Sequence, residues 1–397
     1  MTGHRTVGAV GLALAAAVWA FAAWLLWRSS LPAYHLPHLE EKTFFSSHVL
    51  HQAQHFSAVQ RLFWVGQTVT QLVVLGVFVR YGVRWMRDSA AGPIGTGMLL
   101  GMLGFALVWA ATLPFAVLEV WWQRRYGLSG SYVQATVGNW FALGVRFILL
   151  CVALAIVMGL ARVRRIGDKW WLLAAPVFVG LRTLLAFVQP WLLGGSAYHA
   201  AYAARLERIE HVHVPIRVLA GFTEPNAFAT GLGASRRVFL FRQILDPPFT
   251  PRMDRIVLAH ELGHLAHDHI WKSIAWYALF AFPLAFLIAR VTRSRGGMGW
   301  PEAVPLAIFV YVVFQLATLP LQNVVSRHFE AEADWSALRA THDPVGAQRL
   351  FRLFAPETLD DPNPPWWDYV FLENHPTLMQ RIAMTQYWKR YAAAQSP

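Results

Sequence analysis

The sequence of 397 residues contains one cysteine, four lysines and few charged side chains of any kind. Because an internal disulfide or a multi-cysteine metal site needs more than one thiol, Cys151 alone excludes both. It lies in an apolar stretch, where we expect a small buried hydrophobic side chain. Charged residues make up only 14% of the chain against 56% hydrophobic residues, and the mean hydropathy is +0.38. This balance does not suit a water-facing surface and predicts a membrane protein.

Basic residues outnumber acidic ones by 34 to 22, which gives a formal net charge of +12. In an apolar multi-span chain such an excess usually lies in loops that face the cytoplasm or anionic lipid. We therefore expect membrane lipid and not nucleic acid as a partner. All but four of the basic residues are arginines, which suggests a GC-rich bacterial genome and location in the bacterial inner membrane.

Seven stretches have the length of about 18 to 25 apolar residues that a membrane helix needs. They cover residues 7–27, 62–79, 97–119, 141–161, 170–190, 273–290 and 303–322. The first follows His4 and Arg5 but is too long for a cleavable signal, so we interpret it as a retained anchor. Prolines at 176, 190, 305 and 320 indicate kinks or helix ends in the fifth and seventh stretches.

Charged residues inside the apolar stretches are expected to face protein or water, because a charge that faces lipid is costly. Arg146 and Arg182 are the clearest cases, either as snorkelling side chains or a structural ion pair, or as the wall of a hydrated cavity, and Glu119 closes the third stretch. The polar segment around 28–58 is expected to be an interfacial loop. It carries a loose group of histidines, namely His35, His38, His48, His51 and His55.

The polar segments define four parts of the chain. We expect an N-terminal membrane region with five spans (1–194), a first catalytic segment (195–270), two further spans (271–322) and a second catalytic segment (323–397). The two polar parts can form one domain only if the intervening spans make a hairpin.

Residues 253–270 have the apolar pattern of a helix and contain His260, Glu261 and His264 in the order H-E-x-x-H. Positions i and i+4 share one helix face, so both imidazoles can reach one tetrahedral Zn²⁺. Glu261 projects beside the open coordination position, where it can act as general base toward a metal-activated water. His267 and His269 follow the motif and are expected to support it or to face solvent.

A catalytic zinc needs a third protein ligand. A third histidine ten residues after the first is absent, since Ile270 occupies that position. The segment 326–338 offers carboxylates instead. Glu330 and Asp334 share a helix face, so one can bind zinc while the other accepts a hydrogen bond from a ligand imidazole. Glu332 points elsewhere and is interpreted as a solvated surface charge.

These motifs resemble the M48 zinc metallopeptidases, and in particular the Ste24-type CAAX prenyl proteases. The resemblance rests on seven segments: H-E-L-G-H at 260–264, S-R-x-F-E-x-x-x-D at 326–334, E-P-N-A-F at 224–228 with R-R-V-F-L-F at 236–241, N-H-P-T-L-x-x-R-I at 374–382, and L-P-F-A-V-L-E at 113–119 with Y-G-L-S at 126–129. It covers most of the chain.

The resemblance implies a role for each matching residue. It implies zinc ligands at His260, His264 and Glu330, with the base at Glu261 and a supporting carboxylate at Asp334. It further implies a substrate-binding edge strand at Asn226 and Ala227, and a residue that reaches the scissile carbonyl at His375. It also implies a water-filled chamber enclosed by the spans.

The expected protein is thus an all-α membrane bundle of about seven spans with a small zincin-like α+β catalytic domain. It should hold one Zn²⁺ per chain and hydrolyse peptide bonds of membrane-associated or unfolded polypeptides. The alternative is a zinc-binding membrane scaffold or transporter without protease activity. Counting Lys and Arg in the loops, including Arg80, Arg84 and Arg87, puts the catalytic domain outside, whereas the resemblance implies the cytoplasmic side, which we favour. The oligomeric state stays open.

Overall fold

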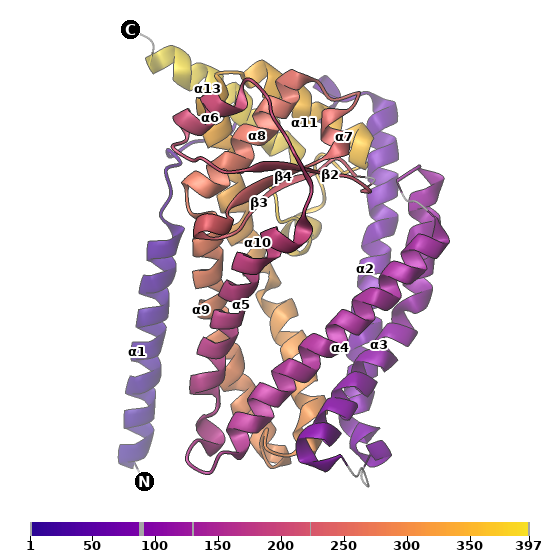
Figure 1. Cartoon of the computed structure of the whole chain (residues 1–397), viewed down its shortest axis with the longest axis vertical. Helices are drawn as coiled ribbons and strands as arrows, with labels where there is room; N and C mark the ends of the chain where they lie inside the picture. Colours follow the sequence, from indigo (N-terminus) through magenta and orange to yellow (C-terminus); the bar gives the residue numbers. More distant parts are fainter. Residues whose placement is uncertain (1, 87–90, 129–130, 223, 396–397) are drawn as a thin grey trace.

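The computed structural model describes residues 2–86, 91–128, 131–222 and 224–395, so that Arg87 and Ser129 lie outside the described residues. A domain that contains a small sheet lies at one end of a set of long helices, and helix α1 begins at the opposite end (Figure 1). The chain therefore divides into a membrane part and a capping domain.

Within the described residues, six helices are long and apolar enough to cross a bilayer. They are α2 (Ser47–Tyr81), α3 (Gly92–Arg125), α4 (Tyr132–Arg162), α5 (Trp171–Leu193), α9 (His269–Thr292) and α10 (Val304–Thr341). A further helix, α1 (Thr2–Trp27), is apolar over Ala13–Trp27. All seven stretches identified in the sequence are helical, which confirms an all-α membrane region of about seven spans.

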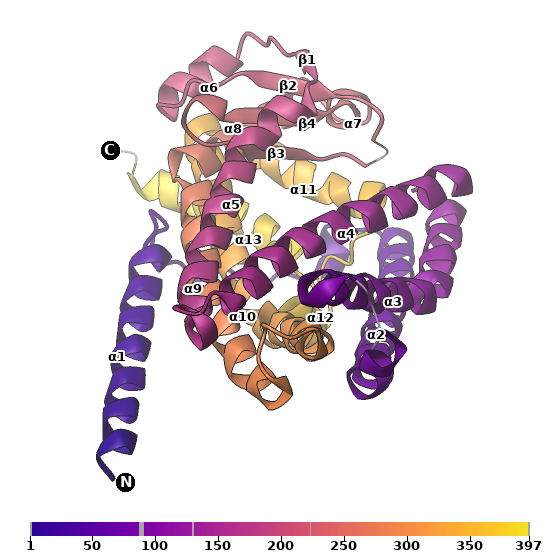
Figure 2. The ribbon, with the colours of Figure 1, turned by 60° about the horizontal axis from the view of Figure 1, so that its bottom comes forward.

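Helix α1 stands apart from the other membrane helices along most of its length (Figures 1 and 2). It contacts α9 through Trp19, whose indole donates a hydrogen bond of 2.8 Å to the carbonyl of Leu279 and meets the Trp276 ring edge-on, and its last residue, Trp27, contacts α10. The residues after α1 then lead the chain up to the capping domain.

Two local expectations are corrected by the structure. Helix α2 begins at Ser47, with the Ser46 hydroxyl accepting a hydrogen bond of 3.3 Å from the amide of Val49. Because this N-cap starts the helix at Ser47, His48, His51 and His55 are helical, and the second half of the 28–58 segment is not a loop. Cys151 is half-buried, not buried.

The prolines fall where a membrane helix tolerates them. Pro176 and Pro190 lie inside α5, Pro320 lies inside α10, and Pro305 occupies the first turn of α10. Glu119 faces protein, since the Gln67 amide of α2 lies 3.5 Å from its carboxylate. Arg146 and Arg182 are both exposed on their helices.

The sheet has four strands in the order β1-β2-β4-β3. These are β1 (Ser196–Ala197), β2 (Ile216–Leu219), β3 (Ala227–Thr230) and β4 (Arg237–Phe241). Strands β2 and β4 are parallel, and β3 is antiparallel to β4 with Ala229 opposite Val238. The central strand β4 is buried along its whole length, which the apolar run that follows Arg237 favours, and β3 forms one edge of the sheet.

Six helices complete the domain: α6 (Ala203–Ile209), α7 (Arg242–Leu245), α8 (Pro251–Ala266), α11 (Pro344–Thr358), α12 (Trp366–Phe371) and α13 (Leu378–Gln395). A single core unites five of them, all except α12, with strands β2 and β4, through side chains such as Leu240, Leu262 and Ile382. Since α10 continues from the membrane part into this core, the same rigid helix belongs to both parts.

Helices α8 and α10 pack very closely at Gly263. A Cβ atom added there would lie 3.0 Å from the Ser336 Cβ and 3.4 Å from the Ala333 Cα. The missing side chain of Gly263 therefore permits the approach that brings residues 330–334 to the face of α8 that carries the two motif histidines.

Candidate metal centre and substrate cavity

The two histidines of α8 and one carboxylate of α10 converge on one point. His264 Nε2 lies 3.1 Å from His260 Nε2 and 3.5 Å from Glu330 Oε1, and His260 Nε2 lies 3.1 Å from Glu330 Oε2. Among the described residues, these three side chains form the cluster of potential metal ligands. Folding thus brings Glu330 of α10 next to the two histidines of the H-E-x-x-H motif.

The spacing of these donor atoms fits a tetrahedral Zn²⁺. Ligand atoms at about 2.0–2.1 Å from zinc in tetrahedral geometry lie roughly 3.3 Å from one another. The observed separations of 3.1–3.5 Å bracket that value. Neutral imidazoles and a carboxylate are also ligand types that zinc accepts, so the residues present fit the metal.

The Nδ1 atoms of both histidines point away from this cluster, and each has a partner. His260 donates to Asp334 Oδ1 at 2.9 Å, and Asp334 in turn accepts two hydrogen bonds of 2.7 and 2.8 Å from Arg381. This arrangement fixes the His260 tautomer with its proton on Nδ1 and leaves Nε2 free for a metal. Arg381 was not recognised in the sequence, although it lies in the 374–382 motif, six residues after His375.

Glu261 is buried beside the cluster, with 6% of its surface exposed. Burial raises the pKa of its carboxyl, while the two motif histidines and a hydrogen bond with the backbone of Ala229 lower it in part. A carboxylate with a raised pKa is a stronger proton acceptor. Its hydrogen bond also places Glu261 at the free edge of β3.

Strand β3 begins at Ala227, one residue after Asn226. The Asn226 carbonyl still accepts a hydrogen bond of 2.9 Å from the Phe241 amide, so Asn226 extends the edge strand. Its side-chain oxygen accepts from the Ala227 amide at 2.8 Å. Both residues line the cavity in front of the metal cluster, where their edge faces open space.

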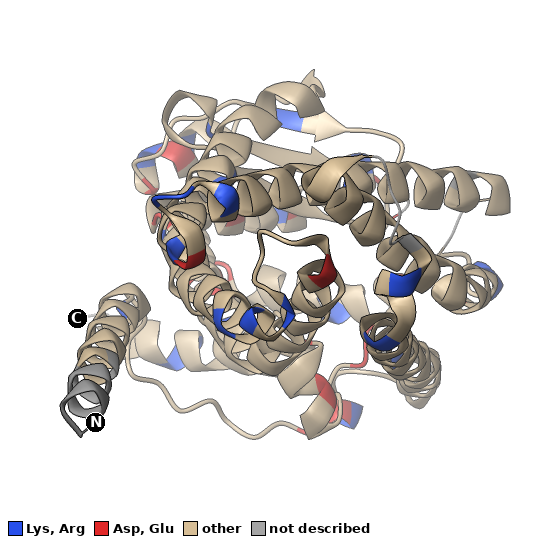
Figure 3. Ribbon diagram, turned by 90° about the horizontal axis from the view of Figure 1, so that it is seen from below, with Lys and Arg blue, Asp and Glu red and all other residues tan. Residues whose placement is uncertain are grey.

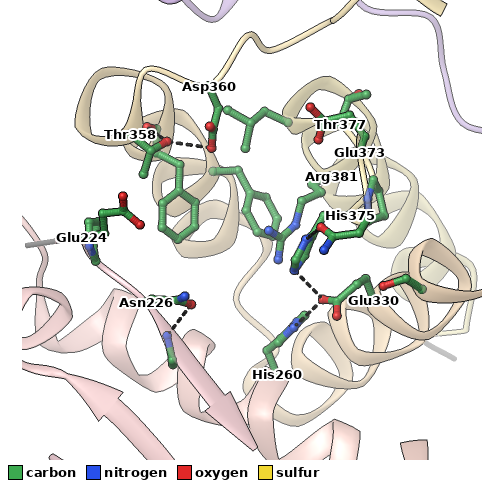
Figure 4. Close-up of a pocket in the computed structure, with 18 of the residues that line it drawn as sticks. Glu224, Asn226, His260, Glu330, Thr358, Asp360, Glu373, His375, Thr377 and Arg381 are labelled. Atoms are coloured by element: carbon green, nitrogen blue, oxygen red, sulfur yellow. Dashed lines mark hydrogen bonds and ion pairs between the residues drawn. The ribbon is translucent and has the colours of Figure 1, made fainter. Parts of the chain in front are cut away.

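This cavity has a volume of about 960 Å³. Figure 4 shows Asn226 on one side of it and His375 with Arg381 on the other, next to Glu330 and His260. His375 Nε2 lies 3.3 Å from Glu330 Oε2, and half of the His375 side chain is exposed. The upper end of α2 closes the cavity with Ser57 and Arg61, so its wall includes membrane helices as well as the domain. Arg146 and Arg182 are not among the lining residues.

Part of the cavity wall is acidic, which the sequence analysis did not predict for a chain of net positive charge. Its carboxylates are Glu224, Asp360, Asp361, Asp368 and Glu373. Arg61 pairs with two of them, at 2.6 Å to Asp361 and by a close contact with Asp368. Four of these carboxylates lie within residues 360–373, and only the fold brings Glu224 and Arg61 to them.

The interpretation of Glu332 as a surface charge is wrong. It is 1% exposed and accepts a hydrogen bond of 3.0 Å from His269 Nε2. The helical periodicity correctly directs it away from Glu330, but that side of α10 is covered by the start of α9 and by the residues that follow α1.

Comparison with known proteins gives likenesses to one peptidase family, to several curated proteins and to solved structures. Residues 200–389 match the profile of "Peptidase family M48". An "Uncharacterized metalloprotease YhfN" of Bacillus subtilis (strain 168) is 25% identical over 368 residues, which cover 83% of this chain and 84% of the relative. A "CAAX prenyl protease 1 homolog" of Oryza sativa subsp. japonica is 26% identical over 167 residues, 40% of this chain and 39% of the relative. The solved structure "Crystal Structure of S. mikatae Ste24p" superposes with a TM-score of 0.66 at 17% identity and covers 93% of this chain and 96% of the other.

The spanning helices, the His/His/Glu cluster and these likenesses define an integral-membrane metalloprotease. Residues 200–389 of the chain match peptidase family M48, and the fold of the whole chain is of the Ste24 type. The sequence-based prediction of this family is therefore confirmed, as is the fold class of a multi-span helical protein with a small α+β domain.

Proposed function

We propose that the protein is a zinc-dependent endopeptidase that cleaves membrane-associated or unfolded polypeptides. The observation that carries this proposal is the convergence of His260, His264 and Glu330 beside the buried carboxylate of Glu261 and in front of a free strand edge. Bound there, Zn²⁺ would act as a Lewis acid that lowers the pKa of water and polarises a peptide carbonyl.

The protein side chains supply the remaining steps. Glu261 takes a proton from the attacking water at its carboxylate and later returns it to the amine nitrogen that leaves. His375, on the opposite side of the cleft, donates a hydrogen bond to the oxyanion that forms on the former carbonyl. Asp334 and Arg381 hold His260 in one tautomer while charge develops.

Substrate binding is assigned to the edge of β3. An extended peptide can add to this edge through main-chain hydrogen bonds, which set its register without reading its side chains. Asn226 and Ala227 are the residues proposed to position it. A folded domain has no free strand to offer and does not fit a cavity of about 960 Å³, so the substrate must be extended or unfolded.

The physiological substrates proposed are membrane polypeptides that require processing or quality control. The arginine-rich, lysine-poor composition favours a bacterial source, where prenylated CAAX tails are not expected. The lining contributed by α2 and α3, through Trp64 and Gln123 for example, gives a chain emerging from the bilayer a direct approach to the metal centre.

The test uses purified full-length protein and an unfolded reporter polypeptide. We expect the wild type to hold about one zinc per chain and to cleave the reporter, and Glu261→Gln to lose at least 10³-fold in turnover while it keeps its zinc. A His260→Ala, Glu330→Ala double variant should lose the metal. Equal zinc content in that double variant and the wild type, or full activity of Glu261→Gln, would refute the proposal. Zinc binding without cleavage would favour the scaffold alternative.

A further inference from the structure

The ring nitrogen of His264 that points away from the metal cluster has another histidine as its partner. This nitrogen, Nδ1, lies 2.9 Å from Nδ1 of His269, which is buried with 3% of its surface exposed. The other motif histidine, His260, meets a carboxylate at the corresponding position. The two proposed ligands thus have different supports: an acid held by an arginine for one, and a second histidine for the other.

Local backbone geometry creates the histidine contact. Helix α8 ends at Ala266, and Asp268 adopts a left-handed conformation with φ of 54° before α9 starts at His269. Asp is one of the few residues that accept this conformation readily. The resulting sharp turn folds the first residue of α9 back against the last turn of α8, where the His269 ring also stacks on Phe329 at 4.6 Å.

The proton positions in this group follow from its chemistry. A histidine that binds a metal through Nε2 carries its proton on Nδ1, so His264 must donate to His269 Nδ1. His269 then accepts at Nδ1 and must carry its own proton on Nε2. That atom lies 3.0 Å from Glu332 Oε2, to which it donates. Each of the three groups has one consistent role.

Glu332 is held firmly although it is buried. Besides His269, its carboxylate has His267 Nδ1 at 3.5 Å and Lys272 Nζ at 3.6 Å, and it accepts a hydrogen bond from the backbone amide of Ser30. The segment that contributes this amide follows α1 directly. The last residue of α1, Trp27, holds the start of this segment on α10. Its ring stacks on His328 at 4.0 Å, and its carbonyl accepts a hydrogen bond of 2.9 Å from His328 Nε2.

We propose that His269 and Glu332 are positioning residues that hold His264 as a metal ligand, with the chain after α1 as the anchor of Glu332. The inference rests on the proposed zinc site. It assigns a role to a histidine and a glutamate that contact neither the metal position nor the cavity edge strand, and it makes the N-terminal segment part of the support of the metal centre.

The test measures zinc affinity by chelator competition and the visible spectrum of the Co²⁺-substituted full-length protein. His269→Phe keeps the stacked ring on Phe329 but removes both hydrogen bonds, and we expect zinc affinity to fall about 10- to 100-fold, as loss of such ligand supports does elsewhere. The Co²⁺ absorption bands should shift, because the orientation and basicity of His264 change. Glu332→Gln, which keeps the side-chain size, should change both readouts in the same direction.

The matched control is His213→Phe, since His213 belongs to the same domain, has 72% of its side chain exposed and has its Nδ1 atom 3.4 Å from the Glu207 carboxylate. It should leave zinc affinity and the Co²⁺ spectrum unchanged. Wild-type affinity and an unchanged spectrum in both His269→Phe and Glu332→Gln would overturn the inference, as would an equal effect of His213→Phe. If the inference failed in this way, the proposed function would still be supported by zinc binding and cleavage in the wild type and loss of cleavage in Glu261→Gln.

Discussion

Glu373 lies in the acidic part of the cavity wall, and the protonation of its carboxyl makes the stability of the folded protein depend on pH. Burial, followed by the negative charges of Asp360 and Asp368, raises the pKa of its carboxyl from 4.5 to about 7. A carboxyl with a raised pKa binds its proton more tightly in the folded than in the unfolded chain. Its contribution to stability is therefore complete below about pH 4.5 and is lost as the pH rises to about 7.

Glu373→Gln should remove this pH-dependent loss. We expect the variant to gain thermal stability relative to the wild type as the pH is raised from 5 to 8, with most of the gain between pH 5 and 7. The measurement is the difference in Tm between the two proteins at each pH, in which the pH dependence of the other groups cancels. A constant difference over this range would contradict the assignment. Glu357→Gln, on α11 and not among the cavity-lining residues, provides the control.

At the level of elements, the site depends on the close packing of α8 against α10. Helix α8 contributes two of the three residues of the metal cluster and α10 the third, and Gly263 sets the separation of the two helices. Gly263→Val would force the helices apart, because overpacking of a tight contact costs about 1–3 kcal/mol and shifts the backbone. We expect a lower Tm and a weaker zinc affinity in this variant.

The control for this prediction is Gly159→Val in α4, where an added Cβ meets no atom within 4 Å. It should change Tm by no more than a few degrees and should leave zinc affinity unchanged. If Gly263→Val bound zinc as tightly as the wild type, the separation of the two helices would not determine the geometry of the metal centre.

For the whole molecule, the open question is which side of the membrane carries the domain. The domain and the start of α1 lie at opposite ends of the membrane part (Figure 1). Viewed from the end away from the sheet, Lys and Arg positions lie on several loops and helix ends (Figure 3). They include Arg80, Arg162 and Arg290 in the last turns of α2, α4 and α9. By the positive-inside rule these would face the cytoplasm, whereas the family resemblance favours a cytoplasmic domain.

We predict the cytoplasmic domain, since it carries many basic residues of its own. A reporter fused after residue 397 should then be active only in its cytoplasmic form, and one fused before residue 1 only in its external form. The two fusions control each other, because the two ends of the chain must lie on opposite sides of the membrane. Activity of the C-terminal reporter only on the outside would show that the loop charges determine the orientation.

The sequence by itself determined the features that depend on local spacing. Seven apolar stretches predict the membrane helices because bilayer thickness sets their length, and the i, i+4 spacing of His260 and His264 puts both on one helix face. The same periodicity paired Glu330 with Asp334.

Only the tertiary structure decided which distant residues meet. Arg381 supports Asp334, and His269 with Glu332 supports His264, through contacts that span up to 63 residues. Ser30 reaches Glu332 across 302 residues. Helical periodicity gives the direction of a side chain but not what covers that side, so Glu332 read as a surface charge in the sequence and is buried in the fold. Burial and long-range pairing result from packing, which no local pattern contains.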